Sequence, residues 1–138
     1  MRTQSLRRTS KIENLELRQF QRVLEGQHDE VLRTLNRLGD EVHSVNADDP
    51  KDIGDICMTT LSREALFRQT SEQRLMVRMI EEALDRIQRS TFGACLACGD
   101  DINPRRLSAL PWTQRCLRCQ EQFEQGTPEY QSAERRLA

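Results

Sequence analysis

The chain has 138 residues, of which 31% are charged and 4% aromatic, and its mean hydropathy is -0.74. These values exclude a large globular core and favour a thin, mainly helical protein. The 21 basic and 22 acidic residues nearly cancel, which argues against tight non-specific binding to nucleic acid.

Residues 1–11 are basic and polar, with Arg2, Arg7 and Arg8 among them. We interpret them as a flexible arm; an arm that contacts nucleic acid is the alternative. The start of the chain lacks the hydrophobic stretch of a secretory signal, and no apolar run is long enough to cross a bilayer. We therefore expect a cytoplasmic protein without membrane contact.

A proline-free stretch from about Ile12 to Val45 predicts the first long helix. Its apolar positions alternate in steps of four and three residues, which is the spacing of a coiled-coil seam. The seam residues are Leu24, His28, Val31, Leu35, Leu38, Val42 and Val45. His28 is the polar member, and we interpret it as a seam residue rather than a metal ligand or catalytic group.

A turn-rich segment at about residues 46–57 follows, and it contains four aspartates. A second proline-free stretch from about Ile56 to Arg89 predicts another long helix. Its second half has a broad apolar stripe, and its first half has a narrower one around Leu61, Ala65 and Arg68. The broad stripe comprises Leu75, Met76, Met79, Ile80, Ala83, Leu84 and Ile87.

Two long helices joined by a short turn predict an antiparallel coiled-coil hairpin over residues 12–90. Its tip lies at about 46–57, and we expect the metal module at the opposite end. The metal module spans residues 91–126, includes the start of a short C-terminal helix after Cys116, and is followed by a tail at 127–138. The fold class is therefore mainly α, with a Cys₄ zinc finger.

Two Cys-x-x-Cys pairs carry the metal chemistry. Cys95 and Cys98 are separated from Cys116 and Cys119 by seventeen residues, which fits a Cys₄ zinc site. A redox dithiol or a pair of disulfides is the alternative. Four protein sulfurs leave no open position for a substrate, so we expect one structural Zn²⁺ and no catalytic metal.

The stretch TFGACLACGDDINPRRLSALPWTQRCLRCQ closely resembles the zinc-finger signature of the DksA/TraR family. The matching residues are Gly93, the four cysteines, Gly99, Ile102, Arg106, Leu107, Ala109 and Pro111. The resemblance extends from about residue 12 to residue 125. It implies a bacterial protein that inserts its hairpin into the secondary channel of RNA polymerase and modulates initiation.

The family's tip pattern is Asp-x-x-Asp-x-Ala, which Asp52, Asp55 and Cys57 match except for cysteine in place of alanine. Helix capping is the alternative for the aspartates. Asp49 would then cap the second helix with Pro50 in its first position, and Asp52 and Asp55 would favour the helix dipole. The two interpretations are compatible.

Some family members respond to guanosine tetraphosphate through basic residues. The positions that align with that site are Glu72, Leu75, Met79 and Gln120, which offer little to a polyanion, so we expect weak or absent dependence on this nucleotide. Arg106 is a candidate either for packing against the finger or for contact with the channel rim.

The leading hypothesis is a monomeric, non-enzymatic transcription regulator without sequence-specific DNA contacts. A nucleic-acid-binding zinc module, with Arg105, Arg106, Arg115 and Arg118 on phosphates, is one alternative. A zinc-stapled adaptor for another protein is the second. The sequence has no phosphate-cradling glycine loop or nucleophile motif that would indicate an enzyme.

Overall fold

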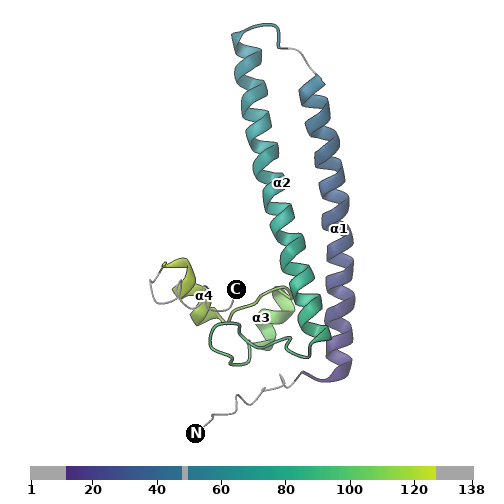
Figure 1. The fold of residues 1–138 in the computed structure, drawn as a ribbon, viewed down its shortest axis with the longest axis vertical. Helices are drawn as coiled ribbons and strands as arrows, with labels where there is room; N and C mark the ends of the chain where they lie inside the picture. The colour runs from purple at the N-terminus through teal and green to yellow at the C-terminus, as the bar shows by residue number, and fades with distance from the viewer. Residues whose placement is uncertain (1–11, 48–49, 127–138) are drawn as a thin grey trace. The chain divides into compact units, whose positions relative to one another are not determined.

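The computed structural model describes residues 12–47 and 50–126. These residues form α1 (Asn14–Ala47), α2 (Ile53–Gln88), α3 (Pro104–Ala109) and α4 (Leu117–Glu124), as Figure 1 shows. Within the described residues, β-structure is limited to an isolated bridge between Ala94 and Asp101. The expected mainly α fold is confirmed.

The chain divides into two compact units. One contains residues 25–81, with most of α1 and α2. The other combines the described residues of 1–24 with those of 82–138, so it holds the first turns of α1, the last turns of α2 and the whole finger. The predicted arm at 1–11 and the predicted tail at 127–138 lie outside the described residues, as does Asp49, the cap in the helix-capping alternative.

In the unit formed by residues 25–81, α1 packs on α2 through the predicted seam. Leu38 is 1% exposed, and the other seam positions of α1 in this unit are partly buried while most of their neighbours are exposed. The imidazole Nε2 of His28 lies 3.1 Å from Oε1 of Glu81 on α2. The seam prediction is confirmed, and His28 meets a carboxylate on the other helix.

The seam of α2 differs from the prediction in its first half. Leu61, Ala65 and Arg68 are exposed, and so is Leu75 of the broad stripe. The seam of α2 is instead formed by less exposed positions that are spaced seven, four or three residues apart and end at Ile80. These are Thr59, Leu66, Thr70, Gln73, Val77 and Ile80.

The register of α2 is set by its packing on α1, so polar residues occupy seam positions that hydrophobicity alone would not select. Thr70 shows how such a residue is accommodated. Its hydroxyl donates to the Leu66 carbonyl at 2.7 Å, which satisfies the polar group within the helix. The apolar residues Leu61 and Leu75 are left facing solvent.

The other unit has its own small core. Leu24, Ala83, Phe92, Ile102 and Leu107 are all buried to 2% exposure or less. The ring of Phe20 on α1 packs against that of Phe92, with centroids 5.3 Å apart. The beginning of the hairpin is thus tied to the finger by aromatic and aliphatic packing.

Helix ends and one short helix depart from expectation. The first helix begins and ends two residues later than predicted, and α2 begins at Ile53 rather than at Ile56. The sequence reasoning missed α3, although Asn103 followed by Pro104 is a start signal: the Asn103 side chain accepts from the Arg105 N–H at 2.9 Å. The helix predicted after Cys116 is present as α4.

None of the helices described is both long and apolar enough to cross a membrane.

Candidate metal centre and hairpin tip

The four cysteines of the two pairs converge on one point. Their Sγ atoms all lie within 4.8 Å of one another, and those of Cys98 and Cys116 are 3.9 Å apart. Sulfurs at the corners of a tetrahedron around zinc, with Zn–S bonds of about 2.3 Å, are about 3.8 Å apart. A disulfide would require about 2.05 Å. The donor set fits one tetrahedral zinc ion and does not fit the disulfide alternative.

The first pair lies in a turn built from backbone hydrogen bonds. The Gly99 N–H donates to the Cys95 carbonyl at 2.9 Å, and the Cys95 N–H donates to the Asp100 carbonyl at 2.8 Å. Gly99 has a φ of +76°, a conformation that side-chain-bearing residues rarely adopt. Glycine directly after Cys98 is therefore required for the turn that aims both sulfurs at the metal.

The second pair lies at the start of α4. Cys116 is the N-cap residue of α4 and Cys119 lies in its first turn. The Cys116 N–H donates to Sγ of Cys95 at 3.3 Å, which connects the two pairs directly. This N–H···S bond favours the thiolate form of Cys95, which zinc requires.

The protonation of the thiols depends on their positions. Burial raises the pKa of Cys95, but backbone hydrogen bonds from Cys98, Cys116 and Ala97 outweigh it and lower the pKa to about 6. Burial, together with hydrogen bonds among the sulfurs, raises the pKa of Cys119 to about 12. Zinc binding must therefore displace a proton from at least Cys119 at neutral pH.

Arg86, near the end of α2, is a buried cation that the sequence reasoning missed. Its side chain is 9% exposed, and its Nη2 donates to the Thr91 carbonyl at 3.1 Å and to the Ala94 carbonyl. Burial lowers the pKa of Arg86, whereas the Cys95 thiolate and Glu82 raise it. Arg86 thus fastens the loop before Cys95 to α2 and places positive charge near the sulfurs.

Two further arginines are engaged within the finger. Nη2 of Arg118 lies 3.8 Å from Oδ2 of Asp100, and a hydrogen bond with Cys98 raises the pKa of Arg118. Arg106, a predicted partner-binding residue, donates from Nε to the Arg115 carbonyl at 3.2 Å. This bond supports the packing interpretation of Arg106.

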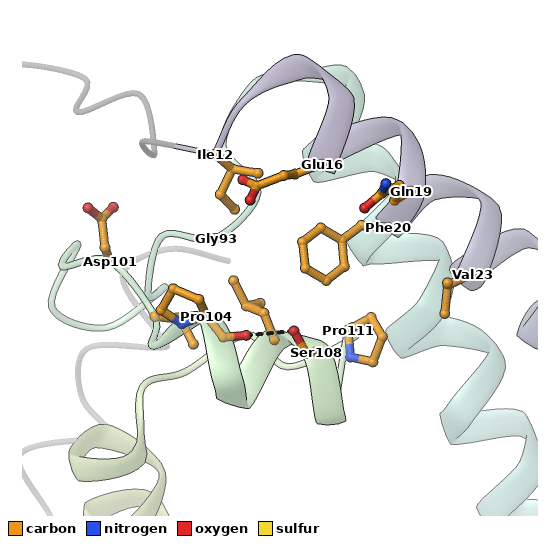
Figure 2. Close-up of a pocket in the computed structure, with 12 residues that line it drawn as sticks. Ile12, Glu16, Gln19, Phe20, Val23, Gly93, Asp101, Pro104, Ser108 and Pro111 are labelled. Atoms are coloured by element: carbon orange, nitrogen blue, oxygen red, sulfur yellow. Dashed lines mark hydrogen bonds between the residues drawn. The ribbon is translucent and has the colours of Figure 1, made fainter.

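A cavity of about 550 Å³ lies between the first turns of α1 and the finger (Figure 2). Phe20 and Val23 of α1 and Pro111 of the finger line it, with the carboxylates of Glu16 and Asp101 also present. The sequence reasoning did not find this cavity because its walls come from segments about eighty residues apart.

The predicted tip residues lie at the start of α2 and are exposed. Oδ1 of Asp52 accepts from the Asp55 N–H at 2.8 Å, and Oδ2 of Asp55 accepts from the Lys51 N–H at 3.3 Å. Asp52 is therefore the cap of α2. In the capping alternative, the helix with Pro50 in its first position is wrong because α2 begins at Ile53. Cys57 is an exposed free thiol one turn further along.

Comparison with known proteins identifies the family. The model of the prokaryotic dksA/traR C4-type zinc finger matches residues 90–125, which include all four cysteines. The protein named RNA polymerase-binding transcription factor DksA from Escherichia coli is 32% identical over 112 residues, covering 75% of this chain and 68% of that protein. The chain belongs to the DksA/TraR family.

Two further proteins are similar to this chain. The Haemophilus influenzae protein of the same name is 30% identical over 106 residues, covering 72% of this chain and 68% of that protein. A protein from Aquifex aeolicus is 35% identical over 97 residues; the match spans 70% of this chain and 63% of the Aquifex protein.

Two solved structures share the DksA fold. DksA2 from Pseudomonas aeruginosa has a TM-score of 0.72 at 24% identity, covering 82% of this chain and 86% of that chain. The RNA polymerase binding protein and transcriptional regulator Dks from Chlamydia trachomatis has a TM-score of 0.54 at 19% identity, covering 85% and 96%. With the C4-type finger matched and the sulfurs clustered, the finger carries one structural zinc ion.

Proposed function

We propose that this protein is a transcription regulator that binds RNA polymerase and inserts its hairpin tip into the secondary channel, where it modulates initiation. The main support is the exposed aspartate pair at the start of α2 in a chain of the DksA/TraR family. Relatives from Escherichia coli and Haemophilus influenzae are named RNA polymerase-binding transcription factors.

The chemistry of the tip favours interaction over catalysis. Asp52 and Asp55 each use one carboxylate oxygen to accept a backbone N–H, and both side chains remain exposed. Fixed carboxylates of this kind can bind metal-associated or cationic groups of a partner without a nucleophile or a general acid. Cys57 replaces the family's alanine with another small side chain, so it is compatible with the same contact.

Zinc, when bound, supplies a structural crosslink and no reaction. Cys95, Cys98, Cys116 and Cys119 would hold it, and they fill all four tetrahedral positions. We therefore expect no catalytic metal and no enzymatic activity. We further expect the protein to act as a cytoplasmic monomer, without sequence-specific DNA contacts and with weak or absent dependence on guanosine tetraphosphate.

The nucleic-acid alternative is less well supported, because three of the four arginines that it invokes already have partners. Arg118 is paired with Asp100, Arg106 donates to a backbone carbonyl, and the Arg115 guanidinium lies 4.2 Å from the centre of the Phe123 ring. Phosphate contacts would have to compete with these interactions, and the chain's formal net charge is -1.

Binding to purified RNA polymerase, followed by crosslinking from position 55, tests the proposal. A photo-reactive residue in place of Asp55 should crosslink to polymerase segments that line the secondary channel. A photo-reactive residue in place of the exposed Arg33 of α1 is the matched control for non-specific crosslinking. Absence of binding by the zinc-loaded protein, or an identical crosslink pattern from both positions, would overturn it.

A further inference from the structure

One flank of α2 carries an exposed apolar and basic stripe that the hairpin does not use. The stripe consists of Ile56, Arg63, Phe67, Arg74 and Arg78. The steps between these residues are seven, four, seven and four, so they lie on one face of the helix. All five are exposed; Phe67 is 74% exposed and Ile56 is 50% exposed.

The position of Phe67 suits an aromatic anchor residue at an interface with a partner. The preceding residue, Leu66, occupies the seam with α1, and the ring of Phe67 therefore points away from that packing. Its neighbours Arg63, Glu64, Arg68 and Ser71 surround it in a shallow concavity. A well-packed phenylalanine removes a large apolar area from water, so a partner surface that covers it would gain substantial affinity.

The charge of the stripe indicates what kind of surface would cover it. Among the described residues, no ion pair is formed by Arg63, Arg74 or Arg78. Glu81 lies near the end of the stripe, but its carboxylate is occupied by His28 at 3.1 Å. Guanidinium groups without intramolecular partners favour carboxylates on another molecule, because Arg and carboxylate pair through two parallel hydrogen bonds.

We propose that this stripe docks against an acidic, apolar surface of RNA polymerase, with Phe67 as the central anchor. The inference rests on the proposed function and adds the face of the hairpin that makes the contact. A protein surface fits better than nucleic acid, because phosphates would pair with the arginines but leave the Phe67 ring and Ile56 uncovered.

Phe67→Gln tests the anchor in the full, zinc-loaded protein. Glutamine keeps high helix propensity, so the substitution should leave the fold intact while removing the apolar contact. The dissociation constant for purified RNA polymerase should rise at least tenfold, as expected for a buried aromatic anchor. Leu61→Gln is the control, since Leu61 lies on the same helix, is 60% exposed and is not on the stripe; it should change binding less than twofold.

Arg74→Glu tests the charge. We expect binding to weaken about three- to tenfold at low salt, with a smaller difference as salt is raised, because the attraction is screened. Arg33→Glu on α1 changes the net charge equally and should have little effect. Circular dichroism and zinc content of each variant check that the fold is unchanged.

The outcomes separate this inference from the proposed function. If the wild-type protein and Phe67→Gln bind polymerase within twofold of each other, the stripe is not the docking face although the proposed function stands. If the wild-type protein does not bind polymerase, both fall. If Arg74→Glu and Arg33→Glu weaken polymerase binding equally, the effect is one of general charge. If the protein binds DNA or RNA without polymerase and Arg74→Glu abolishes that binding, the stripe is a nucleic-acid site. Either result overturns the inference.

Discussion

The carboxylate of Asp52 accepts the backbone N–H of Asp55 at 2.8 Å, so one of the two tip aspartates is also the cap of α2. Gly54 between them makes room for this bond, because a Cβ there would lie 3.2 Å from Oδ1 of Asp52. The tip's charge and the start of the helix therefore depend on the same side chain. A substitution at the tip can be informative only if it separates the two roles.

Asp52→Asn and Asp52→Ala separate capping from charge. Asparagine is as good a cap as aspartate, so Asp52→Asn should unfold at nearly the wild-type temperature, whereas Asp52→Ala should lose about 1 kcal/mol of stability. If the carboxylate acts on polymerase, both variants should bind it but regulate transcription in vitro poorly. Full regulation by Asp52→Asn would show that the charge is dispensable.

Cys57→Ala restores the residue of the family's tip pattern. The thiol is exposed and alanine is a strong helix former, so we expect stability to be unchanged or slightly increased. Transcriptional regulation should also be unchanged under reducing conditions. Thermal unfolding and an in vitro transcription assay check these outcomes; a loss of regulation would assign a specific role to the thiol.

Zinc removal should unfold the finger more than the hairpin. α3 and α4 contain 6 and 8 residues, whereas α1 and α2 contain 34 and 36, so the finger depends more than the hairpin on its metal. Treatment with a strong chelator should therefore reduce the far-ultraviolet circular dichroism only modestly. Proteolysis should become fast between residues 91 and 126 and remain slow between 25 and 47. Equal protection of both segments after complete zinc loss would contradict a structural metal.

Arg86→Met should destabilise the finger. The substitution keeps much of the side-chain volume but leaves the Thr91 and Ala94 carbonyls without their guanidinium donor, at a cost of about 2–4 kcal/mol. Zinc competition and thermal unfolding measure the effect. Arg89→Met is the control, because Arg89 pairs with Asp85 on the exposed surface and such a pair contributes less than about 1 kcal/mol.

Guanosine tetraphosphate should bind RNA polymerase no more tightly in the presence of this protein than in its absence. At the aligned positions, Glu72 repels the polyanion, Leu75 and Met79 are apolar, and Gln120 donates from Nε2 to Glu124 at 2.9 Å. Isothermal titration with and without the protein is the measurement. Micromolar binding that disappears when the protein is omitted would overturn this expectation.

The sequence by itself determined the parts of the molecule whose signals are local. Cysteine spacing alone predicted the zinc site, because two Cys-x-x-Cys turns need only a connecting loop of suitable length to meet. The steps of four and three residues in α1 predicted its seam, because a long helix with that repeat must bury one face. The acidic tip was also visible as four aspartates beside a helix start.

Only the tertiary structure decided which side chains form the contacts between segments of the chain. Packing on α1 fixed the register of α2, placing Thr70 in the seam and leaving Phe67 in solvent. Arg86 became a buried crosslink because the loop before Cys95 brings two carbonyls to it, and Asp52 rather than Asp49 became the cap because α2 begins at Ile53. These outcomes depend on contacts between residues distant in sequence or on backbone geometry, and neither composition nor periodicity specifies them.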